Sequence, residues 1–238
     1  FPASEDVVAI IHRLISESVR PSHLPRLALT SGIPAQHRVM VVIPGMLTQK
    51  ASTLELLNRL QLHYLANPEQ NAQFALLTDW ADADSEQTDS DAARLATARQ
   101  GIKELNTLCP RAVDDACLAP RFLLLHRARL FSPTEQRWIG WERKRGKLEQ
   151  LVTALAVGKT DGFLDLGDES TIEPHTSYIV TLDSDTQLPP GRLRELVGIA
   201  AHPHNQPRLD ASGTVVVSGY GILQPRVATP LPAVKEFT

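Results

Sequence analysis

The sequence lacks several features that would place it in a familiar class at once. It has no apolar run with a length of about 18 residues, so no segment is expected to span a membrane by itself. Its two cysteines, Cys109 and Cys117, have a spacing that fits neither a zinc site nor a thioredoxin motif, which favours a reducing compartment. The formal net charge is −3, and without a basic excess no nucleic-acid partner is expected.

Common catalytic motifs are missing as well. Neither G-x-G-x-x-G nor G-x-x-x-x-G-K-[ST] occurs, which argues against a Rossmann dehydrogenase and a P-loop NTPase. Thr78, Ser184 and Ser218 lie in no G-x-S-x-G context, so a hydrolase nucleophile is unsupported. The opening FPASEDVV has no basic n-region, so it is not expected to be a signal peptide, and it suggests a piece of a longer protein.

What the sequence does contain is an alternation of apolar runs and helical periodicity. The chain has 238 residues and 42% hydrophobic side chains, enough for one sizeable core. Continuous apolar runs that predict buried strands lie at 38–44, 72–80, 121–127 and 177–185, and a final strand or hairpin is expected at 213–227. Apolar residues at helical spacing predict helices over 4–20, 51–67, 90–106, 141–158 and 191–201.

This alternation predicts an α/β fold with a mostly parallel sheet and helices on both faces. Ligands of such sheets bind outside the carboxyl ends of the strands. The predicted strands end, in order, on Pro44, on Asp79, on His126 with Arg127, and on Asp183 with Asp185. Because unpaired carboxylates have no structural purpose at this edge, we expect a cation or a polar ligand to be their partner.

Asp183 and Asp185 form a D-x-D motif at the end of a predicted strand. Residues two apart on an extended strand share a face, so both carboxylates can point at one cation. A hard ion such as Mg²⁺ takes one or two protein carboxylates and completes its shell with phosphates. The alternative is an Asp-capped turn that leads into the helix at 191–201.

Asp79 follows the apolar run FALLT and has two interpretations. It either accepts hydrogen bonds from a nucleotide base or ribose, or caps the turn that follows its strand. Asp82 and Asp84 lie close by, and the sequence does not separate their roles from that of Asp79.

A basic cluster marks the start of the helix at 141–158. Its cations are Arg143, Lys144, Arg145 and Lys147. Cations near the positive end of a helix dipole cost stability unless an anion lies there, and a diphosphate would satisfy both the amides and the side chains. Gly146 would let a backbone or a ligand approach closely. The alternative is a solvated basic face whose charge is partly offset by Glu142 and Glu149.

The carboxyl-terminal part carries weaker signals. His202 and His204 flank Pro203, a context that favours a turn over a metal site. Gly219 and Gly221 interrupt the strand pattern, which suggests close approach of a ligand or of another backbone. The sugar or phosphate contacts predicted in this segment are Gln224 and Arg226.

Five segments together resemble the glycosyltransferase domain of cyclic β-1,2-glucan synthases, which are large bacterial inner-membrane enzymes. These segments are 39–52, 63–83, 137–151, 178–208 and 219–227. More distantly, their order is similar to that in processive family-2 glycosyltransferases such as cellulose synthase, which have a GT-A fold. Helical spacing and the Pro-rich stretch after it predict an N-terminal helix and connector at 1–34. The resemblance implies a GT-A-like domain at 35–238.

The resemblance also implies ligands and roles. The implied donor is UDP-glucose, the implied metal is Mg²⁺ or Mn²⁺, and the implied reaction is inverting transfer to the 2-hydroxyl of a growing glucan acceptor. Asp79 would contact the uridine, Lys147 would lie near the donor, and Asp183 and Asp185 would hold the metal, with Asp185 the favoured direct ligand. The full set of implied donor contacts is Pro44, Asp79, Arg143, Lys144, Lys147, Asp183, Gln224 and Arg226.

One departure from the family pattern concerns the acceptor side. An inverting enzyme needs a general base, and the family carries a Q-x-x-R-W motif after the core strands, whereas this chain has only Glu236 beyond 219–227. We therefore expect a fragment that binds donor without transferring it. In the whole protein it would lie at the cytoplasmic face of the inner membrane, joined to the membrane-embedded remainder, whereas the fragment itself would be soluble.

Two alternative functions and the place of the N-terminal helix remain open. A nucleotidyltransferase also places acids near a metal, but it should have a Gly-rich loop after the first strand, where this chain has only Gly45. A noncatalytic domain that binds a sugar nucleotide or a partner protein would equally lack the base. The helix at 4–20 either packs on a core, which we favour, or lies near a membrane.

Overall fold

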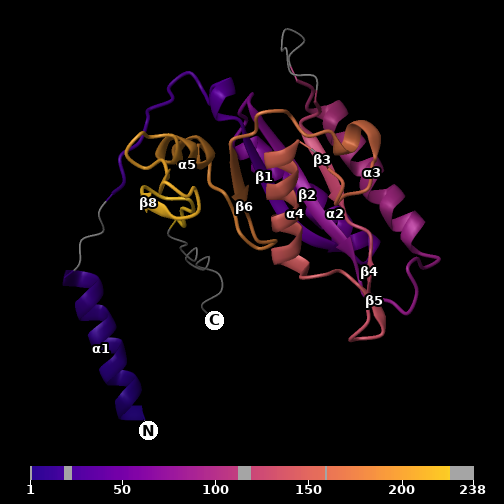
Figure 1. The fold of residues 1–238 in the computed structure, drawn as a ribbon, viewed down its shortest axis with the longest axis horizontal. Helices are drawn as coiled ribbons and strands as arrows, with labels where there is room; N and C mark the ends of the chain where they lie inside the picture. The colour runs from indigo at the N-terminus through magenta and orange to yellow at the C-terminus, as the bar shows by residue number, and fades with distance from the viewer. Residues whose placement is uncertain (1, 19–22, 112–118, 159, 226–238) are drawn as a thin grey trace, which may run out of the picture. The chain divides into compact units, whose positions relative to one another are not determined.

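The computed structural model describes residues 2–18, 23–111, 119–158 and 160–225 (Figure 1). The chain forms two compact units: residues 28–198 make the larger one, and residues 1–27 together with 199–238 make the smaller one. The boundary after residue 34, which the sequence predicted between the connector and the domain, stays a prediction.

The larger unit is built on a four-stranded parallel sheet. Its strands are β1 (Val39–Leu47), β2 (Ala72–Trp80), β3 (Phe122–His126) and β6 (Tyr178–Thr181). They lie in the order β3-β2-β1-β6, and each neighbouring pair is parallel. The predicted α/β class and parallel sheet are thereby confirmed.

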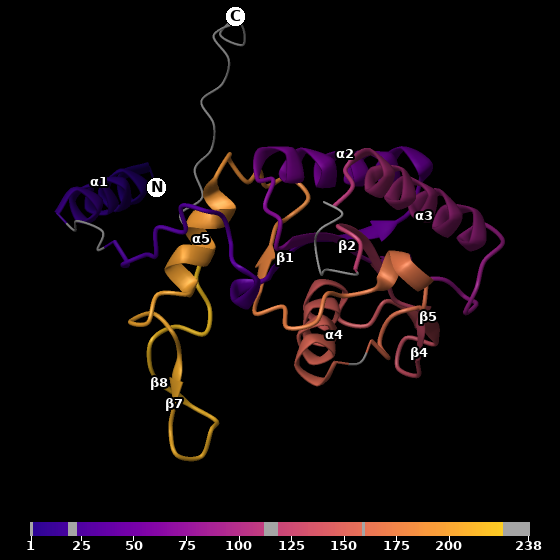
Figure 2. The same cartoon turned by 90° about the horizontal axis from the view of Figure 1, so that it is seen from above.

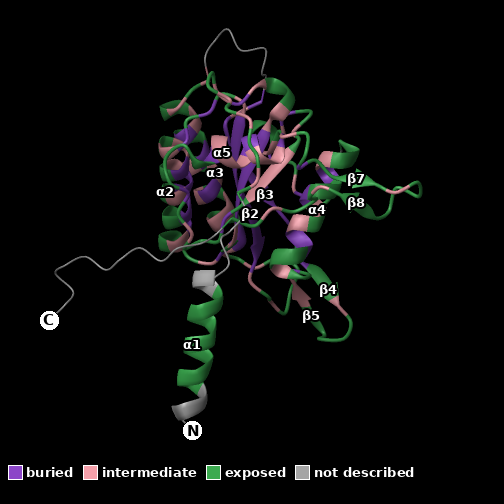
Figure 3. Cartoon of the chain, turned by 90° about the vertical axis from the view of Figure 1, so that its left-hand side faces the viewer, coloured by how far each residue is buried: buried purple, intermediate pink, exposed green. Residues whose placement is uncertain are grey.

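Helices cover both faces of this sheet. In Figure 2, α2 (Lys50–Ala66) and α3 (Asp91–Leu108) lie on one side of the strands, and α4 (Arg143–Val157) lies on the other. Alternate residues of each strand point to opposite faces. Val41 and Ile43 of β1 therefore belong to the core under α2 and α3, and Met40 and Val42 belong to the core under α4. This double burial explains why the central strands, purple in Figure 3, read as continuous apolar runs.

Two strands differ from their sequence prediction. β6 is an edge strand and its residues are only partly buried or exposed, whereas its apolar sequence predicted burial on both faces. β1 does not stop at Pro44 but continues to Leu47. Pairing of β1 with β6 ends at Val42 opposite Thr181, so Pro44 lies where β1 is bonded on one side only and a missing N–H is tolerated.

A hairpin between β3 and α4 was not predicted. Its strands β4 (Leu130–Ser132) and β5 (Arg137–Ile139) are antiparallel. Trp138 of β5 also forms an isolated bridge with Ala83, which follows β2. The hairpin therefore fixes the path of the chain from the sheet edge to the start of α4. Two short 3-10 helices, η1 (Ala35–His37) and η2 (Gly167–Ser170), also belong to the larger unit.

The remaining elements are α1 (Pro2–Ser18), α5 (Arg192–Ala200), and the hairpin of β7 (Arg208–Leu209) with β8 (Val216–Ser218). Residues 5–15 of α1 are all exposed, so the structure does not show the packing expected for this helix. Among the residues that the structure describes, no helix has both the length and the apolar character needed to cross a bilayer.

Two features that the sequence predicted lie in the smaller unit. A Cβ at Gly219 would lie 2.0 Å from the Gln206 carbonyl oxygen, so the close approach predicted there is made by another backbone. The amide of His204 donates to Nδ1 of His202 at 3.2 Å within a turn, as the sequence favoured.

Candidate functional site

The candidate site lies at the carboxyl edge of the sheet, where the strand order reverses. β1 is flanked by β2 on one side and by β6 on the other, and the connections to these two strands cover opposite faces. In open α/β sheets the crevice at such a switch point is the usual ligand site. The start of α4 reaches this edge, because Lys147 Nζ donates to the Gly45 carbonyl at 2.6 Å.

A buried carboxylate with two cations forms the centre of this edge. Asp79 is fully buried; Arg127 Nη2 lies 3.1 Å from its Oδ2, and Lys147 Nζ lies 3.1 Å from its Oδ1. Both cationic side chains are themselves almost completely buried. Asp79 is therefore not unpaired, as the sequence had suggested, since the chain provides two partners and a surplus of one positive charge.

Asp79, Arg127 and Lys147 form an ion triad, and Arg127 is held in it by contacts from several sides. Its Nη2 donates to the Trp141 carbonyl at 2.8 Å, and its Nη1 donates to Gln150 Oε1 at 3.2 Å. Gly140 approaches the carboxylate so closely that a Cβ there would lie 2.5 Å from Asp79 Oδ2. No sequence pattern singled out Gly140 or Gln150, because their roles depend on contacts between segments that are distant along the chain.

Burial lowers the pKa of two neighbouring groups. The pKa of Lys147 is lowered, chiefly by burial and against the attraction of Asp79. The pKa of His126 is lowered to about 3, chiefly by burial and next by the charge of Lys147. His126 Nδ1 lies 2.7 Å from Thr78 Oγ1 in the core. His126 is therefore a neutral core residue, although its position at a strand end had placed it among the ionisable groups expected at the sheet edge.

The cations at the start of α4 pair with acids of the same chain. Arg143 pairs with Asp82 at 2.6 Å, and Lys144 pairs with Asp183. These pairs partly satisfy the charge that had been expected to need an anion. The helix begins after Glu142, whose φ of 45° is left-handed, and no side chain caps its first amides. Exposed cations and uncapped amides thus lie together at the switch point, an arrangement that suits a bound anion.

Gly146, in the first turn of α4, allows a contact within the protein. A Cβ at this position would lie 2.7 Å from both the ring and the carbonyl oxygen of Trp141. The close approach predicted at this glycine is therefore made by Trp141.

The D-x-D motif lies in the turn after β6. The Thr186 amide donates to the Asp183 carbonyl at 3.0 Å, and Arg59 donates to the Ser184 carbonyl. The predicted turn is therefore present, yet Asp183 and Asp185 both remain exposed. No group of three His, Cys, Asp or Glu side chains suited to a metal occurs among the residues described. Two carboxylates fit a hard cation that takes its other ligands from phosphates.

The other predicted residues lie in different surroundings. Pro44 is within β1 beside Gly45, and Asp84 forms an exposed pair with Arg137 at 3.0 Å. Gln224 is exposed in the smaller unit, so its contact with a donor stays a prediction. The remaining predicted positions, Arg226 and Cys117, lie outside the described residues, and Cys109 is a free, partly buried thiol.

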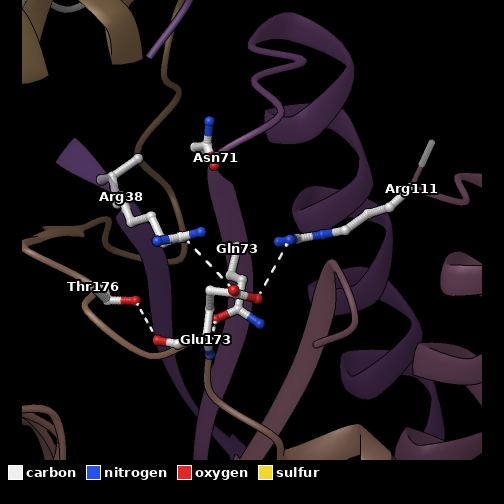
Figure 4. Close-up of a pocket in the computed structure, with 7 residues that line it drawn as sticks. Arg38, Asn71, Gln73, Arg111, Glu173 and Thr176 are labelled. Carbon is white, nitrogen blue, oxygen red and sulfur yellow. Dashed lines mark hydrogen bonds and ion pairs between the residues drawn. The ribbon is translucent and has the colours of Figure 1, made fainter. Parts of the chain in front are cut away.

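A second polar cluster at the amino edge of the sheet is shown in Figure 4. Glu173 lies 3.6 Å from Arg38 and 3.5 Å from Arg111, and its amide donates to Gln73 Oε1 at 2.8 Å. The cluster has no space for a water molecule, and it ties the connector before β6 to the ends of β1 and β2. We assign it a structural role.

Comparison with known proteins supports the resemblance seen in the sequence. No family model matches the chain. The cyclic beta-(1,2)-glucan synthase NdvB of Rhizobium meliloti (strain 1021) is 38% identical over 235 residues, which is 99% of this chain. The chain spans only 8% of the length of that relative.

Proposed function

We propose that this chain, a homologue of a segment of a cyclic β-(1,2)-glucan synthase, is the donor-binding part of an inverting glycosyltransferase domain. The donor would be UDP-glucose, the acceptor a growing β-1,2-glucan, and the metal Mg²⁺ or Mn²⁺. The carrying observation is that the D-x-D motif and the uncapped, cationic start of α4 lie together at the switch point of a parallel sheet. We further propose that this chain is one part of a whole synthase and that the remainder of that protein is embedded in a membrane.

The diphosphate would be bound by the start of α4. The first amides of this helix have no side-chain cap, and the helix dipole favours an anion at this end. Lys144 is exposed and pairs with Asp183 without a ligand. Because its side chain is long and flexible, it can exchange this carboxylate for a phosphate when the donor binds.

Asp183 and Asp185 would hold the metal, since both are exposed and two carboxylates suffice for a cation that shares its shell with phosphates. Such an ion, when bound, neutralises the charge that develops on the departing diphosphate. Release of Asp183 by Lys144 would couple the two events: the carboxylate becomes free for the cation as the ammonium group moves to the phosphate.

Asp79 would act mainly as a positioning residue. It is fully buried, and its two oxygens accept from Arg127 and Lys147, so contact with a uridine would require one cation to move. Holding Lys147 beside the Gly45 carbonyl requires no such movement. The contact of Asp79 with the nucleotide stays a prediction.

Transfer itself needs a general base, and we assign none among the described residues. At the site, Asp79 and Asp82 are ion-paired, and Asp183 and Asp185 are proposed for the metal. We therefore propose that the isolated chain binds the donor and that transfer requires other parts of the whole protein. A noncatalytic sugar-nucleotide module would bind equally well, so only a transfer assay on the whole protein separates these two functions.

The test is calorimetric titration of UDP into the 238-residue chain with and without Mn²⁺. We expect metal-dependent binding that Asp185→Ala weakens by about tenfold or more, because a charged contact to the bound ion is lost. Asp168→Ala is the matched control, since it removes an exposed carboxylate from η2 that is not among the residues assigned to the donor site. Absence of UDP binding to the folded chain, or equal binding by both variants, would contradict the proposal.

A further inference from the structure

A groove lined by α4 and by residues on either side of this helix has no role in the proposed donor site. It has a volume of about 260 Å³ and opens to solvent. Its lining residues are Trp141, Glu149, Gln150, Thr153, Ala154, Val157, Asp161 and Gly162. This volume lies just below the roughly 300–1,000 Å³ of pockets for drug-sized ligands, and it suits a ligand of one or two sugar rings.

The aromatic wall of the groove is fixed but accessible. Trp141 packs its ring edge against Gly146, where a Cβ would lie 2.7 Å from Cε3. The residue nevertheless remains 43% exposed. An indole held rigidly on one side and open on the other loses little conformational entropy when it binds a flat apolar surface.

The polar groups of the groove can both donate and accept hydrogen bonds. Gln150 Oε1 accepts from Arg127 at 3.2 Å, which orients the carboxamide, and its NH₂ group has no acceptor among the described residues. Glu149 and Asp161 are exposed, and neither is in an ion pair with the described part of the chain. Carboxylates accept strong hydrogen bonds from hydroxyl groups.

The charge of the groove narrows the class of ligand. Among the described residues that line it are two carboxylates and no cation, so an anion such as a nucleotide or phosphate is disfavoured. A cation would be attracted by the acids, but this groove offers one aromatic ring where a cage for cations uses several. A neutral sugar matches the lining more completely, because its C–H face can stack on the indole while its hydroxyls bond to the amide and carboxylates.

We propose that this groove binds a neutral saccharide at a site separate from the donor site. That the saccharide is a β-linked glucan rests on the proposed function, whereas the saccharide class rests on the lining alone. Gln150 contacts Arg127, which in turn holds Asp79, so the groove and the sheet edge share one hydrogen-bonded connection.

The test is titration of a β-1,2-linked glucose disaccharide into the 238-residue chain, followed by calorimetry and tryptophan fluorescence. We expect saturable binding that is insensitive to salt. Trp141→Ala should weaken it by about tenfold or more, the loss typical of a central aromatic contact. Asp161→Asn should also weaken it without affecting the fold, while Asp168→Asn, an exposed carboxylate outside the groove, should not.

Three results would overturn the proposal: no saturable binding to the folded chain, equal binding by Asp161→Asn and Asp168→Asn, or binding only of cationic peptides that salt abolishes. UDP titration of the same variants keeps the two proposals apart. Asp161→Asn should retain UDP binding, and Asp185→Ala should retain saccharide binding. A chain that binds sugar but no UDP would refute only the proposed donor site.

Discussion

The buried His126 should make the protein sensitive to mild acid. Its side chain is fully buried, its pKa is lowered from 6.5 to about 3, and burial is the main cause. In the unfolded chain the imidazole regains its ordinary pKa. Between pH 6.5 and about 3 the unfolded state therefore binds a proton that the folded state does not, and stability falls as the pH falls.

The size of this effect follows from the two pKa values. Each pH unit inside the window changes the free energy of unfolding by about 1.4 kcal/mol per proton. From pH 7 to pH 5, a histidine that titrates near 6.5 only in the unfolded state removes about 2 kcal/mol of stability. Carboxylates with lowered pKa values, such as Asp91 at about 2, lose their stabilising effect mainly below this range.

Urea denaturation of the chain at pH 7 and at pH 5 measures the loss directly. The matched variant is Thr78→Val with His126→Phe, which removes both partners of the buried hydrogen bond and leaves no unsatisfied group. Its stability should fall by about 2 kcal/mol less than that of the parent chain over the same pH range. His63, whose pKa is also lowered, is present in both proteins and cancels in the comparison.

An NMR titration of the His126 ring provides an independent readout that needs no variant. The ring should stay neutral from pH 8 to pH 5 in the folded protein. A midpoint near 6.5, or an equal loss of stability in the parent and the double variant, would refute the reasoning.

The ion triad makes two further predictions, both measured as free energies of unfolding by urea denaturation. Asp79→Asn leaves Arg127 and Lys147 buried without a counter-charge and should cost about 3–5 kcal/mol. Lys147→Met leaves the pair of Asp79 with Arg127 intact and should cost less than half as much. Equal costs for the two variants would contradict this order. Gly140→Ala places a Cβ 2.5 Å from Asp79 Oδ2 and should cost about 1–3 kcal/mol. In the control Gly221→Ala the new Cβ meets nothing closer than 4.0 Å, so its stability should stay within about 0.5 kcal/mol of that of the parent chain. A stable Gly140→Ala variant would show that the carboxylate can move.

Much of the fold was predictable from local sequence. β2 occupies the predicted residues 72–80, and α3 begins within one residue of its prediction. These segments are either continuously apolar or strongly periodic, so burial and secondary structure follow from the same pattern. The hairpin of β4 and β5 was missed because its strands are only three residues long and are exposed or partly buried, and such strands carry no periodic signal.

The edge position of β6 was also outside the reach of the sequence. Its residues are as apolar as those of a central strand, but no further strand pairs with it among the described residues. Strand order depends on which helices cover which face, and this is decided by packing between elements far apart along the chain.

The candidate site likewise has one aspect that the sequence predicted and another that it did not. The sequence by itself determined which chemical groups gather at the carboxyl edge, because the parallel α/β pattern brings the strand ends together: Asp79, Asp183 and the start of α4. Only the tertiary structure decided how these groups are paired. Asp79 is fully neutralised by Arg127 and Lys147 inside the protein, while Asp183 and Asp185 stay exposed beside Lys144. Local sequence specifies the type and order of side chains, but burial and ion pairing depend on distances between separate segments, and these distances exist only in the folded chain.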